Sequence, residues 1–509
     1  MFFNNSIFKK VELNPLLTTV KRVLAFFGGL FLSFSCSNDD GSGIRLSISS
    51  LQTTEQGLDT NDFIWKAMNF WYFWQPNVKD LGDNRFENDQ EYTEFLKSES
   101  NSETFLRKLL FEDDRFTFWN EDYEVLLNSL SGVSKSNGLQ FFIIDLTADD
   151  TDNLFGFIRN VVPGSTAAEA GLERGDIFYG VNGQVLTQDN YTNLLFDDSS
   201  SYALNMGEAD VTNRLVNQTE EEITLSKIEN FQEDPIRLAT TLDINGQKIG
   251  YLMYRQFNRN FNSELNEVFG QFVANGVTDL VLDMRYNGGG SVNTSRLLAS
   301  MIYGTNTEEL YVRQRWNDRQ QERFSDDQLE DFFANQVSSG EKLNSLNLSR
   351  VFVLGTNRTA SASELVMNGL DPYIEVIHVG TTTRGKNEFS ISLVDDPSNN
   401  YIYSSSREAN INPNNSWIVQ PLVGRNENAV GFFDYTAGFS PDIEIAEDVF
   451  NLGTFGDPTE PLLARAIEEI TGISGKEASR SRFQEDVRYR EFDTPELELM
   501  VLDKPLKLK

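Results

Sequence analysis

The sequence of 509 residues contains a single cysteine, Cys36, and a single histidine, His378. One cysteine cannot form a disulfide within the chain, so hydrophobic cores alone must stabilise the fold. Basic residues are also few, with 43 Lys and Arg against 77 Asp and Glu, which gives a formal net charge of −34. Such a charge repels phosphate backbones and anionic membrane surfaces, and we therefore expect no nucleic-acid partner.

The apolar run "VLAFFGGLFLSF" is too short to cross a bilayer, but it follows Lys21 and Arg22 as the h-region of a secretory signal does. Cys36 comes next, where a bacterial lipoprotein signal places its lipidated residue. Residues 1–36 therefore resemble a lipoprotein signal peptide, and the polar residues 37–57 resemble a tether. This resemblance implies a lipid-anchored protein of the bacterial cell envelope, on the periplasmic or the surface side of the outer membrane. The alternative is a chance cysteine in a membrane-adjacent segment.

Residues 58–130 are predicted to form a small helical N-terminal domain. The stretch "TNDFIWKAMNFWYFWQP" begins with capping residues at positions 60–62 and is stopped by Pro76. Phe63, Ala67 and Trp71 share one face at helical spacing, and the additional aromatic residues indicate burial on more than one side. An aromatic stripe of this kind is typical of a hydrophobic core, so we assign it no chemistry.

Residues 133–228 change to short strands and turns. In "VVPGSTAAEAGLERGDIFYGVNGQVL" a Pro-Gly turn precedes a short helix, a glycine helix stop, a strand and an Asn-Gly turn. This order closely resembles a PDZ domain. The upstream segment "GLQF" resembles the loop in which such domains bind a peptide's terminal carboxylate through backbone N–H groups. Its residues are Gly138, Leu139, Gln140 and Phe141.

From residue 240 to residue 472, apolar strands such as "KIGYLMYRQF", "DLVLDM", "RVFVLG" and "EVIHVG" alternate with helices. This alternation predicts an α/β layered domain. Residues 473–509 are charged and aperiodic, and we expect a partly ordered C-terminal tail. The predicted fold class is therefore an α+β multidomain protein, with a helical unit, a PDZ domain and an α/β layered core.

Two glycine-containing segments each follow a predicted strand of this core, where turns place backbone N–H groups at the strand ends. One is "LDMRYNGGGS" and the other is "LGTNRTASASE", with a later Gly-Lys pair after the turn "TTTRG". Together they resemble the carboxyl-terminal processing, or tail-specific, serine peptidases. That family's pattern joins an aspartate-arginine-asparagine-glycine-glycine turn, an alanine-serine-alanine-serine-glutamate helix start and a later glycine-lysine. The resemblance implies a crotonase/ClpP-like peptidase core behind a PDZ domain.

The resemblance also implies that Ser361 is the nucleophile and Lys386 the general base, because their separation of 25 positions matches the family's. A lysine amine acts as a base only when it is neutral, and burial in an apolar pocket lowers its pKa toward neutrality. The family's oxyanion-hole donors correspond to the N–H groups of Ala362 and Gly289, with Gly290 as the alternative. Glycine at these turns lets the backbone approach a substrate closely.

The third member of the catalytic group stays open. Many family members carry Gln or Glu four residues after the lysine, where this chain has Ser390. Asp371, close to the position of an acidic residue in some relatives, is the other candidate. Ser363 lies in the same serine repeat, but only Ser361 has the family's spacing to the lysine. His378 lies on an apolar strand, and we interpret it as a core residue.

Three functions from different classes compete. The first is a serine endopeptidase that recognises accessible C-termini of protein or peptide substrates and is attached to the membrane by its lipid anchor. The second is a catalytically silent peptide-binding lipoprotein, and the third is a crotonase-like acyl-transfer enzyme. The presence of Ser361 and Lys386 favours the first function over the second, and the PDZ signature is evidence against the third. The expected Ser-Lys chemistry requires no cofactor and no metal.

Overall fold

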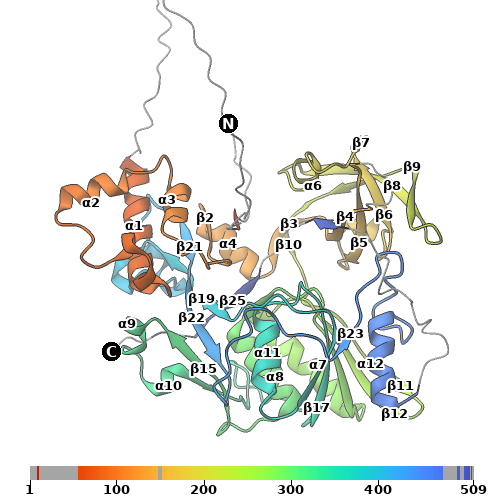
Figure 1. The fold of residues 1–509 in the computed structure, drawn as a ribbon. Coiled ribbons are helices and arrows are strands. Elements are labelled where there is room, and N and C mark those ends of the chain that lie inside the picture. Colours follow the sequence, from red (N-terminus) through yellow and green to blue (C-terminus); the bar gives the residue numbers. More distant parts are fainter. Residues whose placement is uncertain are drawn as a thin grey trace, which may run out of the picture.

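The computed structural model describes residues 9–10, 55–146, 152–473, 490–492, 498–504 and 506. Cys36 and most of the predicted signal peptide and tether lie outside these residues. Figure 1 shows a helical part formed by the first elements, a β-rich domain beside it, and a larger part of mixed helix and sheet below both. None of the helices in the described ranges is long and apolar enough to cross a membrane.

The N-terminal part consists of α1 (Glu55–Trp71), α2 (Asp89–Leu96), α3 (Ser102–Lys108) and α4 (Tyr123–Leu130). Helix α1 begins earlier than the predicted capping residues, and the side chains at two of those positions bind to other segments. Thr60 Oγ1 donates to Asn415 Oδ1 at 3.2 Å, and Asn61 Nδ2 donates to the Leu96 carbonyl at 2.8 Å. These two side chains therefore bind the helix to neighbouring segments and do not cap its N-terminus.

The aromatic stripe of α1 is core, as predicted, and this core is shared with the mixed part of the chain. Trp71 packs against Trp316 with ring centroids 5.7 Å apart, and Phe63 packs against Tyr401 at 5.8 Å. One small sheet also joins the two parts. Its strands, in spatial order, are β1 (Lys9–Lys10), β2 (Phe118–Asn120), β21 (Ile418–Gln420) and β20 (Leu393–Val394).

The chain enters the PDZ domain through β3 (Val133–Ser136) and leaves it through β10 (Ile228–Gln232), and these two strands pair with each other. Its main sheet contains β4 (Leu139–Asp145), β5 (Leu154–Val161), β6 (Ile177–Val181), β8 (Ser201–Asp210) and β9 (Leu215–Ser226), with β7 (Gln184–Val185) beside β6. Two short helices, α5 (Thr166–Glu169) and α6 (Tyr191–Leu195), cover it. Asn182 and Gly183 both have positive φ, so they form the predicted hairpin turn between β6 and β7.

The α/β core is built on a six-stranded sheet. Its order is β11 (Ile236–Ile244), β12 (Gln247–Tyr254), β13 (Asp279–Asp283), β17 (Arg350–Gly355), β18 (Glu375–Gly380) and β23 (Ile443–Glu444), parallel from β12 onward. Helices α7 (Asn262–Ala274), α8 (Val292–Tyr303) and α11 (Ala362–Leu370) pack on one face, and α12 (Pro461–Thr471) packs on the other. Successive strand residues face opposite cores, as in β12, where Leu252 faces the first and Met253 the second.

A second six-stranded sheet lies next to the carboxyl ends of β13 and β17. Its order is β14 (Gly289–Ser291), β25 (Leu499–Val501), β19 (Glu388–Ser390), β22 (Leu422–Glu427), β15 (Leu310–Trp316) and β16 (Glu330–Phe332). Strand β25 belongs to the segment for which the sequence predicts a partly ordered tail, and it is an ordered part of that tail. A second tail strand, β24 (Arg490–Phe492), pairs with β4 of the PDZ domain.

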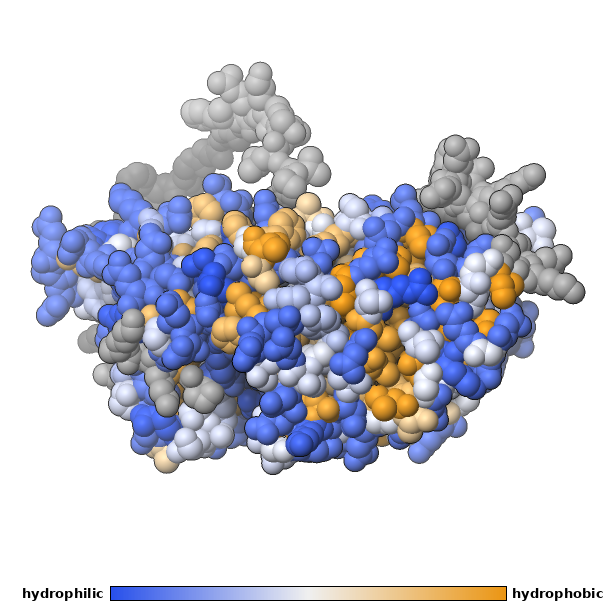
Figure 2. Space-filling model, turned by 90° about the horizontal axis from the view of Figure 1, so that it is seen from below, coloured by the Kyte–Doolittle hydropathy of each residue, from blue (hydrophilic) through white to orange (hydrophobic). Residues whose placement is uncertain are grey.

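Hydrophilic residues cover most of the face that Figure 2 shows, and apolar residues gather there in patches toward one side. This surface agrees with the acidic composition of the chain, since a formal charge of −34 must be carried mainly by exposed side chains.

Candidate active site

Ser361 lies at the junction between the loop after β17 and the first turn of α11. Its backbone has φ 67° and ψ −114°, a conformation that a residue with a Cβ atom rarely adopts. The side chain is fully buried, and its Oγ has no hydrogen-bond partner. A backbone outlier of this kind at a helix start is one of the features that cluster at active sites.

Lys386 follows β18 and the turn at residues 381–385, and its side chain is also fully buried. Its Nζ lies 5.0 Å from the ring centroid of Phe116, a residue of the N-terminal part. The same amine donates to the main-chain carbonyl of Glu498 at 2.5 Å. Arg115, next to Phe116, donates to the carbonyls of Gly385 and Thr436. The N-terminal part therefore covers the lysine and binds the turn that precedes it.

The carboxylate of Glu364 joins the segments that carry these two residues. Its Oε2 accepts from the N–H groups of Ser361 at 2.7 Å and Lys386 at 2.9 Å. Its Oε1 accepts from Gly385 N at 2.7 Å and from Thr383 Oγ1 at 2.6 Å. Sequence reasoning missed this role. The "SASE" motif contains the signal, because Glu at the third helical position often bonds back to the helix start.

Burial raises the pKa of Glu364 from 4.5 to about 7, although four hydrogen bonds favour its charged form. A folded-state pKa above the unfolded one means that the folded protein binds this proton more tightly. The stability that Glu364 contributes is therefore complete below pH 4.5 and is lost as the pH rises through about 7. The difference of the two pKa values corresponds to about 3 kcal/mol.

We expect Glu364→Gln to remove this pH dependence, because an amide does not titrate. Denaturant titrations give the free energy of unfolding of the wild type and of the variant at each pH. The difference, wild type minus variant, should fall by about 3 kcal/mol between pH 4.5 and pH 7.5. Glu267→Gln on α7, where the side chain is exposed, is the matched control and should follow the wild-type profile. A pH-independent difference for Glu364→Gln would contradict the raised pKa.

The glycine turn after β13 lies directly against Ser361. Gly289 has φ 102° and Gly290 has φ 140°, so neither position accommodates a larger residue without strain. A Cβ atom on Gly289 would lie 2.7 Å from Ser361 Cβ and 2.9 Å from Ala362 N. The structure therefore brings together the serine and the segments predicted to supply the oxyanion donors. Gly289 N–H donates to Asn287 Oδ1 at 2.9 Å, while Ala362 N–H, at the first position of α11, has no acceptor within its helix.

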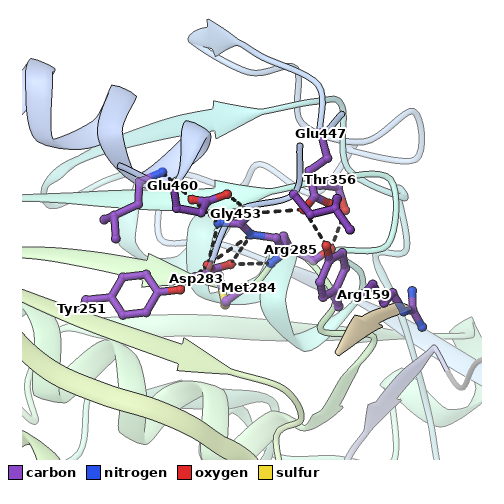
Figure 3. Close-up of polar contacts among 12 residues, drawn as sticks. Arg159, Tyr251, Asp283, Met284, Arg285, Thr356, Glu447, Gly453 and Glu460 are labelled. Atoms are coloured by element: carbon purple, nitrogen blue, oxygen red, sulfur yellow. Dashed lines mark hydrogen bonds and ion pairs between the residues drawn. The ribbon is translucent and has the colours of Figure 1, made fainter. Parts of the chain in front are cut away.

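A buried ion cluster surrounds Arg285, which lies shortly before this turn in the chain (Figure 3). The Arg285 guanidinium, with no exposed surface, pairs with Asp283 at 2.8 Å, Glu460 at 2.7 Å and Glu447 at 3.1 Å. The Arg285 carbonyl accepts from Thr356 Oγ1, which lies in the loop that leads to Ser361. The cluster thus fixes the Arg285 side chain, and the Arg285 main chain in turn is bonded to the loop that leads to Ser361.

The two candidates for a third catalytic member lie apart from each other. Asp371 is exposed at the C-terminal end of α11, on the order of 15 Å along the helix from Ser361. Ser390 is buried in β19, where its one hydroxyl proton has two acceptors within reach, Gln420 Oε1 at 3.0 Å and the Met500 carbonyl at 3.3 Å. The structure does not bring either side chain to Ser361, whose hydroxyl has no partner.

His378 and Ser363 lie within the core. Burial lowers the pKa of His378, although the neighbouring backbone of Gly355 and Ser440 opposes the shift, and this favours the neutral form of its imidazole. Ser363 Oγ donates to the Asn287 carbonyl at 3.0 Å and thereby binds α11 to the glycine turn. Both residues contribute to structure around the site, and neither makes a hydrogen bond to Ser361 Oγ.

The predicted carboxylate loop of the PDZ domain has its own internal bonds. Gly138 N–H donates to Ser136 Oγ at 2.9 Å, and Leu139 N–H donates to Asn137 Oδ1 at 3.1 Å. The Gln140 side chain bonds to Asn160 and to Arg255, which links the loop to the α/β core. Leu139 and Phe141 are buried in the core of the PDZ domain, where Phe141 stacks on Phe196.

Comparison with known families gives matches in three parts of the chain. Residues 59–118 match the Peptidase S41 N-terminal domain, residues 157–195 match a PDZ domain, and residues 248–424 match Peptidase family S41.

Two curated proteins are similar to the chain. It is 28% identical over 208 residues to the chloroplastic C-terminal processing peptidase of Tetradesmus obliquus, covering 38% of this chain and 44% of that protein. It is 25% identical over 271 residues to the carboxyl-terminal-processing protease of a Picosynechococcus strain, covering 52% and 58%. The chain thus spans about half the length of the curated relatives it matches.

A solved structure from Bacteroides fragilis NCTC 9343, of a protein assigned as an S41 protease, has the same fold. It superposes with a TM-score of 0.63 at 27% identity, and the match covers 81% of this chain and 97% of that one.

Proposed function

The chain is a member of peptidase family S41 that contains the family's N-terminal domain, a PDZ domain and the peptidase domain, and from this premise we propose that it is a serine endopeptidase. In this proposal Ser361 is the nucleophile and Lys386 the general base. One observation carries it: a single buried carboxylate, that of Glu364, holds the backbones of both residues, and both of their side chains are fully buried.

The proposed reaction begins when Lys386 accepts the hydroxyl proton of Ser361 as its oxygen attacks the scissile carbonyl. Burial disfavours the charged form of an amine, which favours the neutral base that this step needs. The oxyanion that forms is stabilised by the N–H of Ala362 and by an N–H of the glycine turn at 289–290. Collapse expels the amine of the new N-terminus, which takes the proton from Lys386. Water then hydrolyses the acyl-enzyme by the same route.

We infer that the PDZ domain selects substrates with accessible C-termini, because this domain class binds terminal carboxylates through backbone donors. The second candidate function, a silent peptide-binding protein, would share this domain and lack the reaction. Labelling by a serine-directed phosphonate separates the two, since the peptidase should be labelled at Ser361 and a silent relative should not.

A peptide with an apolar C-terminal residue, prepared with a free and with an amidated end, tests the proposed selection. Because backbone N–H groups only donate, we expect the free-ended peptide to be cleaved at least ten times more efficiently, measured as kcat/KM by mass spectrometry. Gly138→Ala should reduce this preference, since a Cβ there would lie 2.2 Å from Ser165 Cβ at a positive φ. Gly164→Ala, which also has positive φ but meets no neighbour, is the control. Equal rates for the two peptides would refute C-terminal selection.

We also propose that the protein is attached to the bacterial cell envelope through a lipid on Cys36, on the sequence pattern given above. Cys36→Ser should then abolish metabolic labelling with a palmitate analogue and move the protein from the membrane fraction to the soluble fraction. Because a serine is close to cysteine in size but lacks the thiol that carries the lipid, the change tests acylation itself. A cleaved Cys36→Ser form that still sediments with membranes would contradict the proposal.

A further inference from the structure

The C-terminal segment of the chain lies in the active site. Strand β25 pairs in parallel with the glycine turn strand β14, with Leu499 opposite Gly289 and Met500 opposite Gly290. On its other side it pairs with β19, where Ser390 lies opposite Val501. Strand β25 therefore separates the segment that carries the oxyanion glycines from the segment that follows Lys386.

Contacts of this segment reach the catalytic residues themselves. Lys386 Nζ donates to the Glu498 carbonyl at 2.5 Å, and Leu499 N–H donates to the Gly288 carbonyl at 2.7 Å. The Glu498 carboxylate pairs with Arg384 at 2.9 Å, two residues before the lysine. An extended polypeptide strand is thus bound at the position where the proposed base and the oxyanion turn face each other.

Strand β24, from the same segment, lies on the PDZ domain. It pairs antiparallel with β4, with Phe492 opposite Ile143, and the Phe492 ring packs on Tyr191 of α6 at 5.8 Å. An extended segment added to a sheet edge beside a helix is how PDZ domains take up peptides. The Glu491 carboxylate also pairs with Arg358, in the loop that leads to Ser361.

The apolar side chains of residues 499–502 are largely buried, and polar contacts bind the two residues that follow them. Leu499 is 1% exposed, Met500 is fully buried, and Leu502 is 6% exposed, each in an apolar cluster of the core. Beyond them, Asp503 accepts from Ser291 Oγ at 2.7 Å, and Lys504 pairs with Asp331 at 3.1 Å. Such burial and pairing keep the strand in place against solvent, so entry of another polypeptide requires its displacement.

The docked strand is held in a geometry that does not lead to cleavage. The Glu498 carbonyl accepts from the lysine amine instead of lying against the Ala362 N–H, and the Gly289 N–H is bonded to Asn287. Ser361 Oγ has no partner and so makes no hydrogen bond to Lys386. A serine whose proton is not shared with its base is not activated for attack. The segment is therefore bound as an inhibitor would be, and not as a substrate.

We propose that residues 490–492 and 498–504 form an internal inhibitor, which occupies the PDZ edge and the active-site strand position and competes with extended polypeptide substrates. This inference rests on the proposed peptidase function for its biological meaning, but the competition itself is a binding property. A polypeptide that takes the β4 edge displaces β24 and weakens the hold on β25, so substrate capture and release of the inhibitor are coupled.

The test measures binding in full-length protein that carries Ser361→Ala, so that no cleavage is required. The probe is a fluorescein-labelled synthetic peptide with the sequence of residues 488–504, followed by fluorescence anisotropy. Leu499→Asp places a charge in an apolar cluster and should expel β25, and we expect the Kd of the probe to fall at least tenfold. Leu215→Asp, the same change at an exposed leucine of β9, is the control and should leave the Kd unchanged.

Phe492→Ala gives a second, milder variant, because Phe492 is only partly buried on Tyr191. Phe492→Ala should lower the Kd of the probe about threefold. If circular dichroism shows that Leu499→Asp does not fold, the result for Phe492→Ala tests the proposal instead. Folded variants with an unchanged Kd would overturn the proposal. In protein with Ser361 intact, the same variants should raise kcat/KM for a peptide substrate. If the variants bind the probe more tightly but the protein with Ser361 intact cleaves no peptide, the proposed internal inhibitor stands and the proposed peptidase function is refuted.

Discussion

Ser361→Ala is expected to reduce kcat for peptide cleavage by roughly 10⁴-fold to 10⁶-fold, as the loss of a covalent nucleophile does. The hydroxyl has no hydrogen bond to lose, since Ser361 Oγ is buried without a partner. The fold should therefore stay intact, and the melting temperature should not fall. Stopped assays with product detection by mass spectrometry measure the rate, and differential scanning fluorimetry measures the stability.

Two matched controls accompany this variant. Ser363→Ala removes a neighbouring hydroxyl that bonds to the Asn287 carbonyl, so it should cost stability while retaining more activity than Ser361→Ala. His378→Gln should retain most activity, because the histidine is a core residue whose burial favours its neutral form. Inactive, folded His378→Gln together with active Ser361→Ala would refute the assignment of the nucleophile.

Lys386→Ala should abolish cleavage to a similar extent, because nucleophile and base act as one unit and their losses are not additive. Lys386→Arg keeps the positive charge but cannot supply a neutral base, since a guanidinium stays protonated in proteins. Both variants should therefore be inactive. Activity in Lys386→Arg would show that the lysine acts through its charge and not as a base.

Short motifs with fixed spacing made part of the site predictable. Ser361, Lys386 and the glycines at 289 and 290 lie in such motifs, and the structure places their segments around one point. Glu364 lies in the same motif, but its bonds to residues 383–386 depend on how α11 meets the turn after β18. Sequence spacing along one helix does not contain that information.

Asp371 and the C-terminal segment show what sequence spacing alone does not reveal. Asp371 is near Ser361 in sequence, but the two residues lie at opposite ends of α11, and the Asp371 carboxylate is exposed at the C-terminal end. Charged residues are spread through residues 473–509, so the sequence shows no periodic apolar pattern there and predicts no regular element. In the short apolar stretch of this tail, Leu499–Val501 form a strand through pairing with β14, about 200 residues earlier in the chain, and with β19. Long-range pairing of this kind leaves little local signal.

Arg285→Met is expected to lower the free energy of unfolding by about 3–5 kcal/mol at pH 8, because it leaves buried carboxylates without their counter-charge. Asp283 has no exposed surface, and the Glu460 side chain is only 1% exposed. The pKa of Asp283 is already raised by burial, and the Arg285 charge opposes that shift. Urea titrations followed by tryptophan fluorescence measure the loss. The Arg285 main chain, which is bonded to the loop that leads to Ser361, is then held less firmly, so kcat/KM should fall as well.

The pH dependence of this loss distinguishes a charge effect from a packing effect. Without Arg285 the folded-state pKa of Asp283 rises further above its unfolded value, so the stability linked to its protonation is present at low pH and is lost as the pH rises. The destabilisation by Arg285→Met should therefore be smaller at pH 5 than at pH 8. Arg350→Met is the control, because Arg350 pairs with Asp279 at 2.6 Å but is 35% exposed, and it should cost less than about 1 kcal/mol. An equal loss at both pH values would mean that Arg285 stabilises the turn by packing alone.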